Sequence, residues 1–244
     1  DRYFLYQTLF GSYPMPGTSD KTYEDRLVAY LEKYLREGKE RSDWANPNAE
    51  YEETFCAFAS DLLQKTPAFL NSLKDFIAEY VDFGIINSLS QLVLKFSCPG
   101  IPDTYQGTEL WELGFVDPDN RRPVDYDLRK KYLADIRSTS LADQWSVLWE
   151  DRYSGKIKLA LTHQLLKLRN EQLELFKYGS YVPLKTSGKF AKHILAFARR
   201  FKDDWLIVVI PLHTADNPGS NKESTPPFDW QDTKIHFPDA KKLQ

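Results

Sequence analysis

The sequence predicts a mainly α-helical protein that ends in a small antiparallel β module. Apolar residues recur at helical spacing through the first 95 residues. Pro99 and Gly100 then open a long irregular stretch. After Gly179 the pattern changes to short runs of β-branched and aromatic residues between turn residues. We therefore expect three segments, at residues 1–97, 98–177 and 178–244, the last of which forms the β module.

The composition is that of a globular protein. The 244 residues are 42% hydrophobic and 14% aromatic with a formal net charge of −3, which excludes a disordered chain and argues against nucleic acid as a partner. No apolar run reaches the roughly 18 residues of a membrane span. Cys56 and Cys98 make no disulfide framework and, without a signal-peptide pattern, favour the cytoplasm. Because Asp1 opens the chain without an initiator methionine, we expect part of a longer protein.

Periodicity and cap residues place the helices. Thr22 is a candidate N-cap, and Glu32 and Arg36 are spaced to form an ion pair on one helix surface. Pro67 suits the first position of a helix, which Gly84 is expected to break. The predicted helices cover Tyr3–Phe10, Tyr23–Glu37, Glu50–Gln64, 67–83, Ile85–Phe96, Leu128–Ile136, Leu141–Trp149 and Lys156–Phe176.

The predicted strands follow Gly179, apart from a short candidate at Ile101–Gln106. Asp203 and Asp204 indicate a hairpin turn, and a polar loop is expected over Asp216–Pro227. The β segment holds enough apolar residues that a cut near Tyr178 is expected to leave a module with its own cooperative melting. The predicted strands of the module are Tyr181–Leu184, Ile194–Arg200, Trp205–Leu212 and Lys234–Phe237.

Candidate binding chemistry is concentrated between Cys98 and Asp127. Seven carboxylates are interleaved there with two arginines and with the aromatic rings of Tyr105 and Trp111, a combination that suits sugar recognition. A surface loop held by internal Asp–Arg pairs explains the same residues equally well. A calcium loop is disfavoured because it lacks the expected glycine and carries arginines. The residues concerned are Asp103, Tyr105, Glu109, Trp111, Glu112, Asp117, Asp119, Arg121, Arg122, Asp125 and Asp127.

No metal site or cofactor is expected from the sequence. The histidines at 163, 193, 213 and 236 lack the spacing of a metal-ligand pair. Neither a nucleophile elbow nor a phosphate-binding loop is present in the sequence.

One string in this segment resembles a known family. GIPDTYQGTELWELGFVDPDNRRPVDY is similar to the eighth-strand region of maltooligosyltrehalose synthases, which are (β/α)₈ enzymes of the α-amylase superfamily. DRYFLYQTLFGSYP, YEDRLVAYLEKYLREGKERSDWANPNAEYEE and KIKLALTHQLLKLRNEQLELFKYGSYVPL resemble the C-terminal half of the same family. The resemblance implies a partial barrel: a helical subdomain after strand seven over 1–97, strand eight, its long loop and closing helices over 98–177, and a C-terminal β domain over 178–244.

The resemblance also implies an activity. The family converts the reducing-end α-1,4 bond of a maltooligosaccharide to an α,α-1,1 bond by intramolecular transglucosylation, with retention through a glycosyl-enzyme intermediate. Its three catalytic carboxylates lie on strands four, five and seven, and the His-Asp motif of strand seven is absent from this sequence. We therefore assign no catalytic residue. The implied partners are a maltooligosaccharide substrate and the remaining N-terminal barrel of the same polypeptide, and the chain alone is expected to be inactive.

The site residues are expected where barrel enzymes bind substrate, in the loop after a strand. Arg121 and Arg122 are expected to shape the loop more than to contact sugar, and Trp44 is either a sugar platform or a packed loop aromatic. A different function remains open, a stand-alone carbohydrate-binding or interaction module without catalysis. The candidate substrate-binding residues are Tyr105, Gln106, Glu109, Asp119, Asn120, Arg121, Arg122, Asp125 and Trp44.

Overall fold

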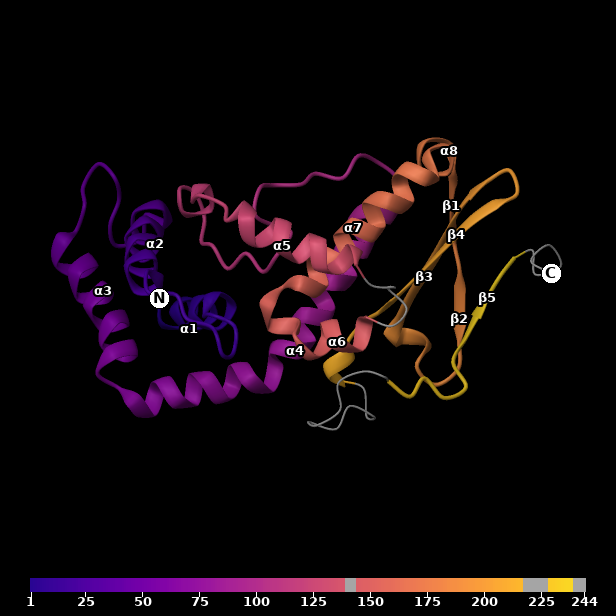
Figure 1. The fold of residues 1–244 in the computed structure, drawn as a ribbon. Helices are drawn as coiled ribbons and strands as arrows, with labels where there is room; N and C mark the ends of the chain where they lie inside the picture. Colours follow the sequence, from indigo (N-terminus) through magenta and orange to yellow (C-terminus); the bar gives the residue numbers. More distant parts are fainter. Residues whose placement is uncertain (139–143, 217–227, 239–244) are drawn as a thin grey trace. The chain divides into compact units, whose positions relative to one another are not determined.

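The structure is a computed structural model that describes residues 1–138, 144–216 and 228–238 (Figure 1). The described chain is mainly helical with small antiparallel sheets, which confirms that part of the expected fold class. It forms two compact units, one of residues 1–79 and 111–126 and the other of residues 80–110 and 127–244. The boundaries of these units differ from those of the three predicted segments, and the predicted segments stay a prediction. In the described part, no helix is long and apolar enough to cross a membrane.

The first unit is built around three helices and the beginning of a fourth. Helix α2 buries Leu27, Leu31 and Leu35, which recur every four residues on one face, and α1 contributes Leu5 and Leu9. This spacing is the reason that both segments are helical. The helices are α1 (Arg2–Ser12), α2 (Tyr23–Gly38), α3 (Ala49–Gln64) and α4 (Pro67–Ser97), of which α4 continues into the second unit.

The helix ends differ in part from the expected caps. Thr22 precedes α2, but its backbone is already helical and its side chain makes no cap bond. Asp20 instead accepts hydrogen bonds from the backbone N–H and the hydroxyl of Thr22. Asn48 caps α3 by accepting from the backbone N–H of Tyr51. The expected pair on α2 is confirmed, with 2.7 Å between Arg36 Nη1 and Glu32 Oε1.

The predicted break at Gly84 is wrong, because α4 runs without interruption through it. A glycine inside a helix costs only about 0.5–1 kcal/mol relative to alanine. Burial of Ile85, Ile86 and Leu92 in the following turns outweighs that cost.

The predicted strand at Ile101–Gln106 is also wrong for this structure, since these residues are irregular. A strand exists only through hydrogen bonds to a neighbouring strand, and none of the described strands pairs with this segment. Ile101 is accordingly 98% exposed. The described residues therefore contain no strand that corresponds to the expected eighth strand of a barrel.

The remaining helices follow the predictions with shifted ends. The long helix predicted over Lys156–Phe176 is divided at Gln172, whose backbone leaves the helical region. Residues 141–143 of one predicted helix lie outside the described residues. The observed helices are α5 (Tyr126–Arg137), α6 (Trp145–Glu150), α7 (Lys156–Glu171) and α8 (Leu173–Tyr178), with short 3₁₀ turns at Asp119–Arg121, Arg152–Ser154, Ala191–His193 and Thr214–Asp216.

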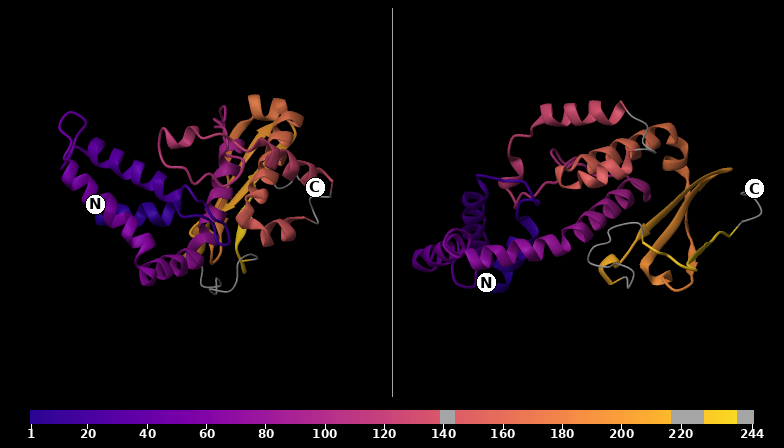
Figure 2. Two further views of the ribbon diagram at one scale, coloured as in Figure 1. Left: turned by 60° about the vertical axis from the view of Figure 1, so that its left-hand side comes forward. Right: turned by 60° about the horizontal axis from the view of Figure 1, so that its bottom comes forward.

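All strands of the described residues follow Gly179, in the orange-to-yellow part of Figure 2. One antiparallel sheet has the order β1-β3-β4 and a second pairs β2 with β5. The four predicted strands are present, whereas β2 was missed because it is short and polar. The hairpin turn falls at Lys202 and Asp203, one residue earlier than expected. Residues 217–227 of the predicted polar loop are not described. The strands are β1 (Ser180–Pro183), β2 (Lys185–Ser187), β3 (Ile194–Phe201), β4 (Asp204–Pro211) and β5 (Lys234–His236).

The two faces of the larger sheet have different partners. On one face, Ala196 and Ala198 pack with Leu184 and with residues of β5. On the other face, Phe197 and its neighbours pack against Val93 of α4 and the residues beside it. Part of the core of the predicted β module therefore comes from a helix far earlier in the sequence.

Two arginines bind carbonyls at the end of α4, Arg199 from β3 and Arg169 from α7. Arg199, only 2% exposed, donates to the backbone carbonyls of Ser97, Phe176 and Gly179 at 3.2, 3.0 and 2.9 Å. Arg169 donates to the carbonyl of Phe96 at 2.7 Å. Carbonyls at the C-terminus of a helix lack partners within the helix and favour cations. Burial, together with the nearby charge of Arg169, lowers the pKa of Arg199.

Candidate functional site

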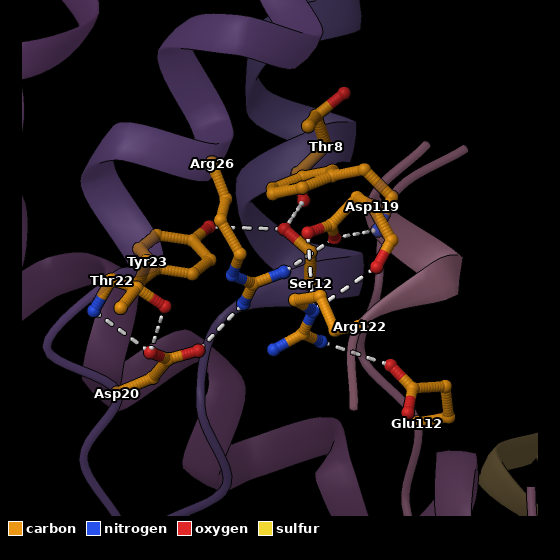
Figure 3. Close-up of polar contacts among 10 residues, drawn as sticks. Thr8, Ser12, Asp20, Thr22, Tyr23, Arg26, Glu112, Asp119 and Arg122 are labelled. Carbon is orange, nitrogen blue, oxygen red and sulfur yellow. Dashed lines mark hydrogen bonds and ion pairs between the residues drawn. The ribbon is translucent and has the colours of Figure 1, made fainter. Parts of the chain in front are cut away.

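Segment 111–126 is held in the first unit by the carboxylate of Asp119 (Figure 3). Oδ2 of Asp119 accepts from Nη1 of Arg26 at 2.6 Å and from the backbone N–H of Phe115 at 2.7 Å. Oδ1 lies 3.2 Å from Nε of Arg122. The side chain of Asp119 is 13% exposed. Asp119 is thus a structural anchor of the loop, and its oxygens are engaged by this chain's own cations.

Arg26 of α2 bridges two carboxylates from different segments. It binds Asp119 and, through Nη2, Asp20 at 2.7 Å. Its guanidinium also lies 5.3 Å from the ring centroid of Phe115. Burial by itself would raise the pKa of Asp20, but hydrogen bonds from Thr22 and Arg26 and the charge of Arg26 outweigh it, and the net pKa is lowered. One arginine therefore binds both carboxylates, and it helps to keep Asp20 ionised.

The outer residues of the loop form a second set of ion pairs. Arg121 pairs with Asp117 at 2.5 Å, and Arg122 reaches Glu112 at 3.1 Å. Internal Asp–Arg pairs are therefore present in the loop, as one of the two interpretations of its composition predicts, and sugar recognition by the same residues stays a prediction. These pairs also leave Asp117 and Asp119 bound to cations, which is unsuited to a calcium loop. No cluster of three or more metal-ligating side chains is present among the described residues.

A cavity of about 270 Å³ lies beside this loop within the first unit. Tyr30 stacks on Phe115 at its wall, with ring centroids 4.8 Å apart. Lys33 donates to the backbone carbonyl of Asp117 at the same wall. The cavity is slightly smaller than the range of roughly 300–1,000 Å³ typical of small-molecule sites. Four of the charged groups in its lining, Arg26, Lys33, Asp117 and Asp119, are already paired, which favours loop packing over ligand binding.

The candidate residues of the second unit lie in a turn after the irregular segment 101–105. The backbone carbonyl of Tyr105 accepts from the N–H and the hydroxyl of Thr108, which closes the turn. Glu109 binds Nε of Arg129 at 3.1 Å, and Arg129 also donates to the carbonyl of Gly107 at 2.7 Å. Glu109 is therefore held by a partner on α5. Tyr105 is 48% exposed, and Gln106 is exposed with no hydrogen-bond partner among the described residues.

The last candidates differ in exposure from the anchored ones. Asn120 is exposed in the turn between Asp119 and Arg121, and Asp125 is exposed directly before α5. Trp44 is 58% exposed in the loop between α2 and α3. Its two predicted roles, a sugar platform and a packed loop aromatic, both stay predictions. The structure thus brings Asp119 and Arg122 together, while Arg121 pairs with Asp117 and Trp44 belongs to another loop.

Sequence reasoning missed the cations that hold the candidate acids. Arg26 lies 93 residues from Asp119, and Arg129 lies 20 residues from Glu109. Charged residues on a helix are usually solvated, and no local spacing distinguishes these two from their neighbours. Only the tertiary fold identifies the pairs.

The comparisons with known proteins point to one enzyme family. A putative maltooligosyl trehalose synthase from Mycobacterium tuberculosis is 33% identical over 206 residues, which are 84% of this chain and 24% of that protein. A cyclomaltodextrinase from Thermoanaerobacter pseudethanolicus is 30% identical over 119 residues, which are 49% of this chain and 16% of that protein. No family model matches the chain.

The fold agrees with the sequence comparison. A crystal structure of a maltooligosyl trehalose synthase superposes with a TM-score of 0.74 and 32% identity, covering 86% of this chain and 27% of that chain. The chain therefore spans about a quarter of the length of the synthases that it matches. By sequence and by fold, the chain is a homologue of the C-terminal part of the maltooligosyl trehalose synthases.

Proposed function

We propose that the chain acts as the C-terminal part of a maltooligosyltrehalose synthase. The single observation that carries this proposal is the match in sequence and fold over 86% of the chain to a structure of such an enzyme. In the reaction, the reducing-end α-1,4 bond of a maltooligosaccharide breaks and an α,α-1,1 bond forms between the same two sugar units. The proposed location is the cytoplasm, a reducing compartment in which the free thiols of Cys56 and Cys98 would persist.

The proposed role of this chain is to shape the substrate pocket, not to carry the reacting carboxylates. In the family, those carboxylates lie on barrel strands four, five and seven, and the remaining N-terminal barrel would supply them. Residues 101–105 have no regular secondary structure, none of the described strands pairs with them, and Ile101 is exposed. We propose that segment 101–106 becomes strand eight when barrel neighbours are present. The residues that follow it would then lie at the catalytic face.

The contacts suggest how the candidate residues divide between two tasks. Asp119, Arg121 and Arg122 are engaged with one another or with neighbouring charges, and they would set the shape of the loop. Gln106 and Asn120 are exposed and offer amide groups, which donate to and accept from sugar hydroxyls. Tyr105 and Asp125 are also exposed. Glu109, held by Arg129, would contact sugar with its remaining lone pairs.

The first test is the activity of the chain by itself. We expect the purified chain to leave maltopentaose unchanged after long incubation, because the proposed catalytic carboxylates are outside it. Reducing ends and products are measured by colorimetric assay and chromatography, with a full-length synthase as the positive control. A non-reducing product from the chain alone would overturn the proposed division of labour.

The decisive test is a segment exchange in a full-length synthase. The corresponding segment of the Mycobacterium tuberculosis relative is replaced by this chain, and the hybrid is assayed with maltopentaose. We expect formation of the trehalose-terminated isomer. In the hybrid, Gln106→Ala should lower kcat/KM by roughly tenfold, the loss of one hydrogen bond to substrate, without a change in Tm. A hybrid that melts cooperatively but is inactive would contradict the proposed function and favour a stand-alone carbohydrate-binding module.

A further inference from the structure

The loop between α2 and α3 is fixed by a buried carboxylate. Glu52 is 5% exposed and accepts from Nε and Nη2 of Arg36 at 2.9 and 2.7 Å, and from the hydroxyl of Ser42. The oxygen of Ser42 in turn accepts from the backbone N–H of Asn48 at 2.9 Å. A buried ion pair is costly unless its hydrogen bonds are satisfied, as they are here. These contacts tie both ends of the loop to the two helices.

The tip of the loop is ordered by its own residues. Oδ1 of Asp43 accepts from the backbone N–H groups of Ala45 and Asn46 at 2.7 and 2.8 Å. Such a turn holds the backbone on both sides of Trp44. The guanidinium of Arg36 lies over the Trp44 ring, 4.9 Å from its centroid. One face of the indole is thus backed by a cation that is itself fixed by Glu52.

The rest of the indole is open. Trp44 is 58% exposed although it stands in an ordered loop, and leaving a large aromatic ring in water gains nothing for folding. An aromatic side chain held in advance by its neighbours loses little conformational entropy on binding. Asn46, two residues further along the same loop, is exposed, and among the described residues only its backbone N–H is bound, by Asp43. An exposed ring with an amide side chain two residues away in the same loop is suited to a ligand with apolar faces and polar edges.

We propose that Trp44 is a preformed platform on which a pyranose ring of an α-1,4-glucan chain stacks, at a place separate from the loop 111–126. The choice of an α-glucan rests on the proposed function. The axial C–H bonds of a glucose unit would lie on the open indole face, and its hydroxyls would meet the amide of Asn46. No bond is formed or broken at this platform.

The test is direct binding, without turnover. The 244-residue chain is titrated with maltoheptaose by calorimetry, and with cellohexaose as the β-linked comparison. We expect Trp44→Ala to weaken maltoheptaose binding by roughly tenfold, which corresponds to the loss of about one aromatic contact. Tyr178→Ala is the matched control, because Tyr178 is a similarly exposed aromatic at 59% on another element. It should bind as the unaltered chain does.

A second variant tests whether the platform must be held in place. Glu52→Gln keeps Trp44 but weakens the hydrogen bonds to Arg36 and Ser42, so it should reduce the affinity for maltoheptaose. Trp44→Phe keeps an aromatic ring, so it should retain part of the affinity that Trp44→Ala loses. Circular dichroism and Tm show that each variant is folded. Equal affinity of Trp44→Ala and the unaltered chain, or no measurable binding by the latter, overturns the platform. Equal Trp44-dependent binding of cellohexaose overturns the assignment to α-glucans. The activity of the hybrid enzyme tests the proposed function separately.

Discussion

At the scale of single residues, Asp119 determines whether segment 111–126 stays in place. Its carboxylate accepts from a buried arginine, a second arginine and a backbone N–H. Asp119→Asn keeps the shape but removes the charge, and it should lower the free energy of unfolding by about 1–3 kcal/mol. Urea denaturation measures the loss. Asn120→Ala, a change at an exposed neighbour, should leave the midpoint unchanged, and an equal loss in both variants would contradict the role of Asp119.

A second prediction at this scale concerns acid. Hydrogen bonds from Arg36 and Ser42 hold the pKa of Glu52 below its ordinary value of 4.5. The stability that this carboxylate contributes is therefore fully present above pH 4.5 and is lost as the pH falls through its lower folded-state pKa. We expect Tm to exceed that of Glu52→Gln at pH 7, and the difference to shrink below about pH 4.5. A difference that is constant from pH 7 to 3 would show that Glu52 is not the titrating group.

The sequence indicated the candidate loop but not how its members are used. The run of acids, arginines and aromatic rings between Cys98 and Asp127 is visible in the sequence, and its internal pairs Asp117–Arg121 and Asp119–Arg122 lie three or four residues apart. The longer links to Arg26 and Arg129 depend on how helices pack, which no local pattern encodes. For the same reason, no local pattern distinguishes the buried Glu52 from the exposed acids of its helix.

At the scale of elements, a substitution at Gly84 tests whether α4 is a continuous helix. A Cβ added at Gly84 meets nothing within 4 Å, so Gly84→Ala should raise the free energy of unfolding by about 0.5–1 kcal/mol. Thermal melting measures the gain. Gly179→Ala is the opposite case, because its Cβ would lie 2.2 Å from the carbonyl oxygen of Leu175, and it should lower Tm. A loss of stability in Gly84→Ala would mean that the helix is broken there.

Helices with a strong period were predictable, and elements that depend on distant partners were not. Helix α2 and strands β3 and β4 carry their own burial patterns and were found within one or two residues. Segment 101–106 carries a strand-like composition, but its pairing would require strands that are not among the described residues. At Gly84 the local pattern predicted a helix break that does not occur. The cost of a glycine in a helix, about 1 kcal/mol, is smaller than the stabilisation from burial of apolar side chains in the neighbouring turns.

At the scale of the whole molecule, the β module is not expected to fold alone. Phe197, Val208 and Ile210 pack against Val93 and Leu94 of α4, so residues 178–244 lack one side of that core. We expect this piece to show no cooperative melting, contrary to the independent module that the sequence suggested. Residues 80–244 should melt cooperatively, because they restore α8 and the part of α4 that carries Val93 and Leu94. Circular dichroism of both pieces provides the measurement, and a sharp transition of 178–244 alone would contradict this expectation.

The buried guanidinium of Arg199 has a consequence for hydrogen exchange. One side chain serves carbonyls at the end of α4, at the end of α8 and just beyond it. If one of these backbone segments opened alone, the buried guanidinium would lose a carbonyl hydrogen-bond partner. Local fraying would then carry an additional free-energy cost. The protected amides of β3, of the last turn of α4 and of α8 should therefore exchange with deuterium together, as one cooperative opening unit.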